Sequence, residues 1–355
     1  MSRVVGTDVG TMFFQVAEND ADGKLSLKEV RNAFVELEAS EDIEQVLAQN
    51  DWQYVSDKDH YYVLGEDSMR VARMFPGKVE LRRPMQGGVL NKGENKKMLV
   101  MAKMIESSIG RAPDNQSLVC ICVSSDPIDN VQDNLFHKVR LEGMFKNLGW
   151  EIKVIEEGHA VVLSEKPIMI EKDGTKTPFT GIGISFGAGK VNCVLTYKAL
   201  PVIGMSAARS GDWIDQKVAE QTDKPLSQIT NIKETKLDFN NIDYDDDVIF
   251  ALDAYYTNMI EYVFKNFSKK FAEVKSEFEA PLDIILAGGT SMPPGFRDKV
   301  EKVVRSLDLP FKIKDIKISK DPRNSVVKGL LTQAIISQKK LKEKLKDEEI
   351  DKMLD

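Results

Sequence analysis

Val4-Val5-Gly6-Thr7-Asp8-Val9-Gly10-Thr11 stands near the start of the chain, and Gly181-Ile182-Gly183-Ile184-Ser185-Phe186-Gly187-Ala188-Gly189-Lys190 stands near its middle. Superposing Gly10 on Gly187 places Asp8 on Ser185. Each turn is followed by an apolar segment that is typical of a strand. A strand, a tight glycine turn and a returning strand bring backbone N–H groups together, and such nests bind phosphate. The repeated turn predicts two domains that hold a nucleotide between them.

Composition and charge restrict the class of protein. At 355 residues, the chain is long enough for two domains. A net charge of −7 argues against a general nucleic-acid binder, which would carry a basic excess. The first predicted strand begins almost at Met1, and no apolar run reaches the roughly 18 residues of a membrane span. We therefore expect a cytoplasmic protein without a signal peptide or a transmembrane segment.

The cysteines and histidines do not suggest a metal site. Cys120, Cys122 and Cys193 lie inside apolar, strand-like runs, so we expect buried thiols in a reducing compartment. The histidines do not show the spacing of metal ligands.

Two glycine motifs have both a phosphate-binding and a plain structural interpretation. In the first, Gly10 allows close approach of a phosphate, Thr11 adds a hydroxyl, and Asp8 can hold Mg²⁺ through its waters. The alternative is a hairpin in which Asp8 only starts a turn. The second motif resembles a P-loop, but Ile184 and Val191 occupy positions that require glycine and Ser or Thr. A second phosphate hairpin fits better than a P-loop, and a hairpin without a ligand is the alternative.

A third motif, Leu286-Ala287-Gly288-Gly289-Thr290-Ser291-Met292-Pro293-Pro294-Gly295-Phe296, closes one predicted strand and opens a helix. With this string the chain resembles the actin-like ATPases of the actin, Hsp70 and sugar kinase superfamily. The string is similar to the adenosine motif of actin, and the first turn resembles that of bacterial actins. Residues 62–90 resemble the segment before the first connecting helix. The similarity spans about residues 3–336, and the short chain favours the prokaryotic MreB, ParM or MamK type.

The resemblance implies an α/β, two-domain actin-like ATPase fold built from duplicated RNase H-like domains, each with a smaller inserted subdomain. Domain I is expected at 1–158 with its insertion at about 35–80. Domain II is expected at 159–338 with its insertion at about 205–275, and the last helix is expected to return to domain I. Residues 339–355 form a charged tail, expected to be a solvated helix or a frayed end.

The resemblance also implies roles for individual residues around ATP or ADP and Mg²⁺. Asp8 would manage the metal. The phosphates would be bound by Gly10, Thr11, Met12, Ser185, Gly187, Ala188 and Gly189. The nucleoside would be enclosed by Gly211, Asp212, Lys233, Glu234, Gly288, Gly289, Thr290 and Met292. Glu157, or its rival Glu156, would position the attacking water, although either glutamate can instead be a solvated helix cap. Lys233 and Glu234 can instead be a surface pair.

The chain departs from the family pattern at two positions. The family usually has Asp where Ser185 stands, and serine cannot carry that charge, so we expect slow hydrolysis or a different metal arrangement. Actin has a phosphate-binding lysine where Gln15 stands. Lys190 is a candidate for replacing the lost positive charge, but the plainer expectation is that Lys190 faces solvent.

The resemblance implies a cytoskeletal ATPase that assembles with copies of itself into filaments, with a cargo adaptor as a further partner. A small-molecule kinase of the same superfamily is the first alternative, although the motifs offer no second catalytic Asp. A non-polymerising ATP-binding adaptor of the FtsA or PilM kind is the second alternative. Such adaptors tend to have a membrane-binding terminus or a large inserted domain, and neither is evident.

Overall fold

The computed structural model describes residues 2–75, 77–90, 95–129, 134–166, 168–170, 174–274, 278 and 280–354. Contacts divide the chain into two compact units. Unit 1 comprises Met1–Ile121, Asp133–Lys153 and Ala334–Asp355, and unit 2 comprises Cys122–Gln132 and Val154–Gln333.

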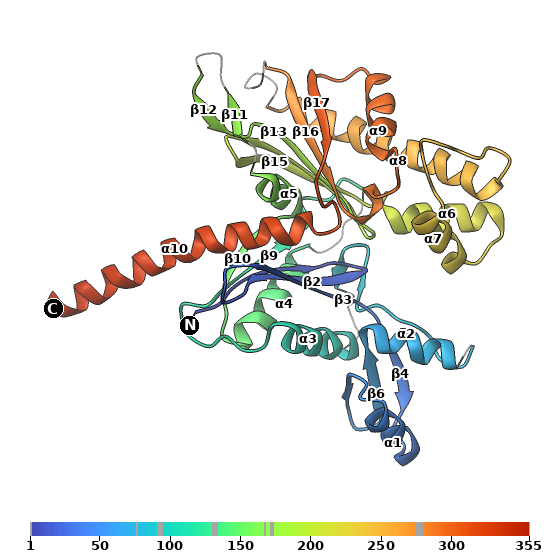
Figure 1. Cartoon of the computed structure of the whole chain (residues 1–355), viewed down its shortest axis with the longest axis vertical. Coiled ribbons are helices and arrows are strands. Elements are labelled where there is room, and N and C mark those ends of the chain that lie inside the picture. Colours follow the sequence, from blue (N-terminus) through green and yellow to red (C-terminus); the bar gives the residue numbers. More distant parts are fainter. Residues whose placement is uncertain are drawn as a thin grey trace. The chain divides into compact units, whose positions relative to one another are not determined.

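Each unit is organised around a five-stranded sheet, and the two sheets share one topology (Figure 1). The first sheet has the order β10-β9-β1-β2-β3 and the second β17-β16-β13-β14-β15. In both, three antiparallel neighbours form a meander, and the first of them pairs in parallel with a later strand. The strands are β1 (Val4–Val9), β2 (Phe13–Asn19), β3 (Leu25–Arg31), β9 (Leu118–Val123), β10 (Glu151–Glu156), β13 (Gly181–Phe186), β14 (Val191–Tyr197), β15 (Leu200–Ala207), β16 (Leu282–Ala287) and β17 (Ile313–Ile318).

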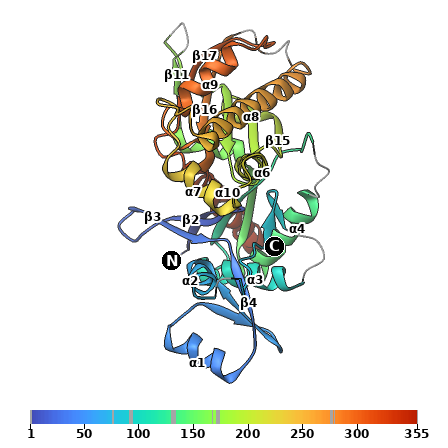
Figure 2. The same ribbon diagram turned by 90° about the vertical axis from the view of Figure 1, so that its right-hand side faces the viewer.

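Unit 1 also contains the inserted residues after β3. They form a small sheet of order β4-β6-β5, in which β4 is Phe34–Glu38, β5 is Tyr54–Ser56 and β6 is His60–Leu64. The remaining elements of unit 1 are α1 (Glu41–Gln49), α2 (Gly65–Met74), β7 (Met85–Gln86), β8 (Val89–Leu90), α3 (Asn95–Ile109) and α4 (Asn134–Asn147). Figure 1 and Figure 2 both show α1 and the small sheet on the far side of α2 and α3 from the five-stranded sheet of unit 1.

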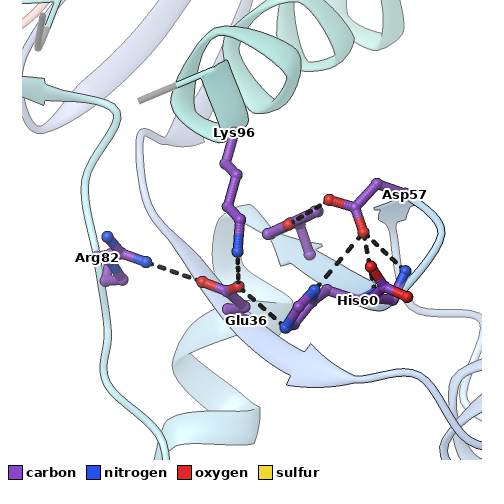
Figure 3. Close-up of polar contacts among 7 residues, drawn as sticks. Glu36, Asp57, His60, Arg82 and Lys96 are labelled. Atoms are coloured by element: carbon purple, nitrogen blue, oxygen red, sulfur yellow. Dashed lines mark hydrogen bonds and ion pairs between the residues drawn. The ribbon is translucent and has the colours of Figure 1, made fainter. Parts of the chain in front are cut away.

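A cluster of charged side chains joins the small sheet to its neighbours (Figure 3). Glu36 of β4 accepts a hydrogen bond from Arg82 Nη1 at 2.8 Å and one from Lys96 Nζ of α3. His60 Nε2 of β6 lies 3.4 Å from the Glu36 carboxylate, and His60 Nδ1 lies 3.6 Å from Asp57. The cluster therefore fixes the small sheet against α3.

Alternation along β13 and β14 gives the second sheet two different faces. Ile182, Ile184 and Phe186 join the large apolar core together with side chains of α8 and α9. Because successive side chains of a strand point to opposite faces, the intervening Gly183 and Ser185 lie on the other face, where α5 packs. Figure 1 shows α8 and α9 together beside this sheet.

Unit 2 contains further elements outside this sheet. They are α5 (Glu157–Glu165), β11 (Ile168–Ile170), β12 (Lys176–Pro178), α6 (Gly211–Thr222), α7 (Leu226–Thr235), α8 (Asp247–Phe271), the 3₁₀ turn η2 (Gly289–Ser291) and α9 (Phe296–Arg305). The last helix, α10 (Ser325–Leu354), begins in unit 2 and its second part belongs to unit 1.

Candidate nucleotide-binding site

The first predicted phosphate turn joins β1 to β2 in unit 1. Gly10 N donates to Phe13 O at 3.0 Å and closes the turn. Asn32 Nδ2 donates to Gly10 O at 2.8 Å, and Asn32 N donates to Met12 O at 2.9 Å. Both carboxylate oxygens of Asp8 lie 3.9 Å from the point that a Cβ on Gly10 would occupy. Asn32 therefore holds the turn through hydrogen bonds, and the Asp8 carboxylate, predicted to bind the metal, lies at the edge of the turn.

Two further side chains, those of Thr11 and Gln15, lie at or next to the first predicted phosphate turn. Thr11 is nearly buried, and its Oγ1 accepts a hydrogen bond from Gly88 N at 3.1 Å. Gln15, directly across the hairpin from Asp8, is also buried and donates from Nε2 to Glu29 at 2.8 Å. Position 15 thus supplies an amide where actin has a cation.

The second predicted phosphate turn joins β13 to β14 in unit 2. Gly187 N donates to Lys190 O at 3.0 Å and closes it. The first residues of α6 are hydrogen-bonded to this turn. Gly211 N donates to Gly187 O at 3.1 Å, and Asp212 N donates to Ala188 O at 2.8 Å. Thr290 Oγ1 also donates to Gly187 O, at 3.0 Å. Hydrogen bonds therefore join residues predicted to bind the phosphates to residues predicted to enclose the nucleoside.

Lys233 supports this assembly from inside unit 2. Its Nζ lies 2.8 Å from Asp215 Oδ1 and donates to Gly211 O at 3.1 Å. Both side chains are less than a tenth exposed. Burial raises the pKa of the Asp215 carboxyl, and the neighbouring Lys233 ammonium opposes that shift. Lys233 is consequently not half of a surface pair with Glu234, which is exposed.

The Gly288–Gly289 turn has one constrained and one open glycine. Gly288 has a φ of +95°, and a Cβ there would lie 2.4 Å from Phe186 O. A Cβ on Gly289 would meet no atom within 4 Å. Met292, which follows, is half exposed. The turn thus presents bare backbone to an open space, which fits contact with a flat nucleoside.

Glu157 is brought to the second hairpin by two glycines. A Cβ on Gly158 would lie 2.9 Å from Gly183 O, and a Cβ on Gly183 would lie 2.3 Å from Gly158 O, so α5 packs directly on β13. Ser185 Oγ then donates to Glu157 Oε1 at 2.7 Å, and Asn192 Nδ2 donates to Glu157 Oε2 at 2.7 Å. The carboxylate also lies 3.8 Å from the Cβ point of Gly187.

Glu156 points elsewhere. Its Oε1 lies 2.5 Å from the point that a Cβ on Gly204 of β15 would occupy, and the Ser125 hydroxyl lies 2.6 Å from the same point. Glu156 is the N-cap residue of α5, but its side chain makes no capping hydrogen bond. Of the two candidate glutamates, Glu157 lies beside the predicted phosphate hairpin.

Lys190 does not face solvent, so that expectation was wrong. Its side chain is 5% exposed. Burial lowers the pKa of the Lys190 ammonium to about 8, while the charges of Glu157 and Asp129 oppose the shift.

The three cysteines are buried, as predicted. In the part of the chain that the structure describes, none of the helices is long and apolar enough to cross a membrane.

Asn192 and Asp215 were not among the residues predicted from the sequence. Asn192 had a detectable signal, because a hairpin closed at Gly187 sets Asn192 opposite Ser185, with both side chains on one face. Asp215 had only its position one turn into α6.

Residues 3–334 match the Volactin family. The chain belongs to the Volactin family. None of the curated proteins matches the chain.

Solved structures extend the comparison over nearly the whole chain. A MamK double helical filament is 16% identical with a TM-score of 0.65, and the match covers 94% of this chain and 99% of that one. MreB5 of Spiroplasma citri bound to AMPPNP is 13% identical with a TM-score of 0.66, covering 98% and 99% of the two chains. The ADP-bound form of MreB5 is also 13% identical, with a TM-score of 0.65 and coverage of 96% and 99%. This chain therefore has the actin-like fold of MreB and MamK, which confirms the predicted fold class.

Proposed function

We propose that this protein binds ATP with Mg²⁺ and assembles with copies of itself into filaments in the cytoplasm, hydrolysing ATP slowly. The observation that carries the proposal is a set of hydrogen bonds in unit 2, in which Gly187 O accepts from Gly211 N and Thr290 Oγ1, and Ala188 O accepts from Asp212 N. The likeness to a MamK filament and to nucleotide-bound MreB5 supports both halves of the proposal.

The donor types fit the proposed ligands. Gly10 N and Gly187 N close the two glycine hairpins, so other backbone N–H groups of these hairpins would bind phosphate oxygens. The Asp8 carboxylate at the edge of the first hairpin would hold Mg²⁺ through water, because this ion keeps much of its hydration. When bound, Mg²⁺ neutralises charge on the phosphates. The open backbone at Gly289 would receive the nucleoside.

Sedimentation and electron microscopy with ATP and Mg²⁺ test the assembly. We expect filaments with ATP and a monomer in its absence. Asp8→Asn keeps the size of the side chain and removes its charge, so it should abolish Mg²⁺-dependent binding of a fluorescent ATP analogue. Asp22→Asn, at an exposed turn of the same unit, removes the same charge and should bind like the wild type. A protein that stays monomeric at high concentration with ATP would contradict the assembly proposal, and unchanged affinity in Asp8→Asn would remove Asp8 from the site.

A further inference from the structure

Asn192 lies on the side of β14 that faces α5, and its surroundings fix its amide. The side chain is fully buried. Its Oδ1 accepts a hydrogen bond from Ser125 N at 3.2 Å, so its Nδ2 is turned to Glu157 Oε2 at 2.7 Å. An amide held at both ends cannot rotate without losing a buried hydrogen bond, and an unsatisfied buried polar group is unfavourable. Asn192 therefore restricts where the Glu157 carboxylate can point.

Ser185 completes the grip on Glu157. It is the direct cross-strand partner of Asn192, and its Oγ donates to the other oxygen, Glu157 Oε1, at 2.7 Å. Both donors are neutral. A carboxylate has about four lone-pair sites, so holding it through two donors is compatible with accepting a hydrogen bond from water. Glu157 itself is half-buried rather than sealed.

We propose that Asn192 is a positioning residue for ATP hydrolysis, holding the Glu157 carboxylate so that it orients the attacking water; this rests on the function proposed above. The water oxygen bonds to the γ-phosphorus, and the bond from that phosphorus to the bridging oxygen breaks with its electron pair remaining on ADP. One water proton stays on the released phosphate and the other leaves to solvent. Ser185 then acts as a donor to Glu157, and an Asp at this position would instead set a second carboxylate against it.

The first test compares single-turnover phosphate release with binding of an ATP analogue. Asn192→Ala should slow release by up to about 100-fold, since small misplacements of a reacting group cost that much, and should leave the analogue's affinity unchanged. Thr196→Val is the matched control: Thr196 is buried on the same strand and donates to Gly181 O at 3.1 Å, away from Glu157. It should hydrolyse like the wild type.

Two further variants separate positioning from simple support of the fold. In a protein that already carries Glu157→Gln, adding Asn192→Ala should not slow hydrolysis further. If Asn192→Ala instead caused independent structural damage, the rate losses of the two single variants would multiply in the double variant. Asn192→Asp keeps the shape if Asn192→Ala fails to fold. Its carboxylate would share a proton with Glu157, so its rate relative to the wild type should fall as the pH rises.

Each of these measurements can contradict the positioning role of Asn192. Wild-type hydrolysis rates in Asn192→Ala, a fully multiplicative double variant, or a pH-independent loss in Asn192→Asp would overturn the proposal. Filaments that assemble with ATP without releasing phosphate would also overturn it, while leaving the assembly proposal intact. Failure of the wild type to assemble with ATP would count against the proposed function itself.

Discussion

Replacing Lys190 with methionine should stabilise unit 2. Burial lowers the pKa of this ammonium from its ordinary 10.5 to about 8. At about 1.36 kcal/mol per pKa unit, the folded state loses about 3 kcal/mol by keeping the group charged. Methionine has a similar length and no charge to desolvate. Lys190→Met should therefore raise the free energy of unfolding at pH 7 by about 3 kcal/mol.

The stabilisation by Lys190→Met should depend on pH. Between about pH 8 and 10.5 the folded state releases the Lys190 proton while the unfolded chain keeps it. Stability therefore rises with pH through this window, and the cost is fully present below it. The advantage of Lys190→Met over the wild type should shrink from pH 7 to pH 10. Because other groups titrate in both proteins, the difference between the two isolates Lys190 from them.

Urea unfolding followed by tryptophan fluorescence measures the free energy of unfolding of unit 2 alone. The chain has three tryptophans, and Trp52 and Trp150 belong to unit 1. With both changed to phenylalanine, Trp213 reports on unit 2. Lys265→Met, at a half-exposed ion pair with Glu261, should change stability by less than about 0.5 kcal/mol.

A destabilised Lys190→Met, or a difference from the wild type that stays constant between pH 7 and 10, would refute the reasoning. Greater stability together with weaker ATP binding would show that the buried charge serves the ligand.

The buried pair and the glycine turn give the remaining predictions. Lys233→Met leaves the Asp215 carboxylate buried without its partner and should cost about 3–5 kcal/mol of unfolding free energy, whereas adding Asp215→Leu should recover most of it; the same fluorescence assay decides, and equal stability of single and double variants would contradict the pairing. Gly288→Ala should destabilise unit 2, since it needs a positive φ and has no room for a Cβ. Gly289→Ala should fold normally but bind the ATP analogue more weakly, and unchanged binding would remove Gly289 from the nucleoside contact.

Where elements end depends on packing that a local pattern does not contain. The helix α8 ends at Phe271, although apolar residues continue in the sequence as far as Phe278. Phe278 instead packs its ring against Phe271 and Tyr197, with centroids about 6 Å apart. The charge-rich residues that follow β4 contribute β5 and β6 to the three-stranded sheet, together with the helices α1 and α2. At the other end, α10 continues through the charged tail to Leu354, which accords with its opposite charges at helical spacing.

The sequence by itself determined the two hairpins and the glycine turn at 288–289, because strand alternation and turn chemistry act between near neighbours. The fold class was predicted from the resemblance of these motifs to those of actin-like ATPases. Tertiary structure alone decided the chemistry around these motifs. It placed Glu157, and not Glu156, beside the second hairpin by packing α5 on Gly183, and it set Asn192, 35 residues away, on the Glu157 carboxylate. It also buried Lys190, whose solvation depends on the whole of unit 2 and on no pattern along the chain.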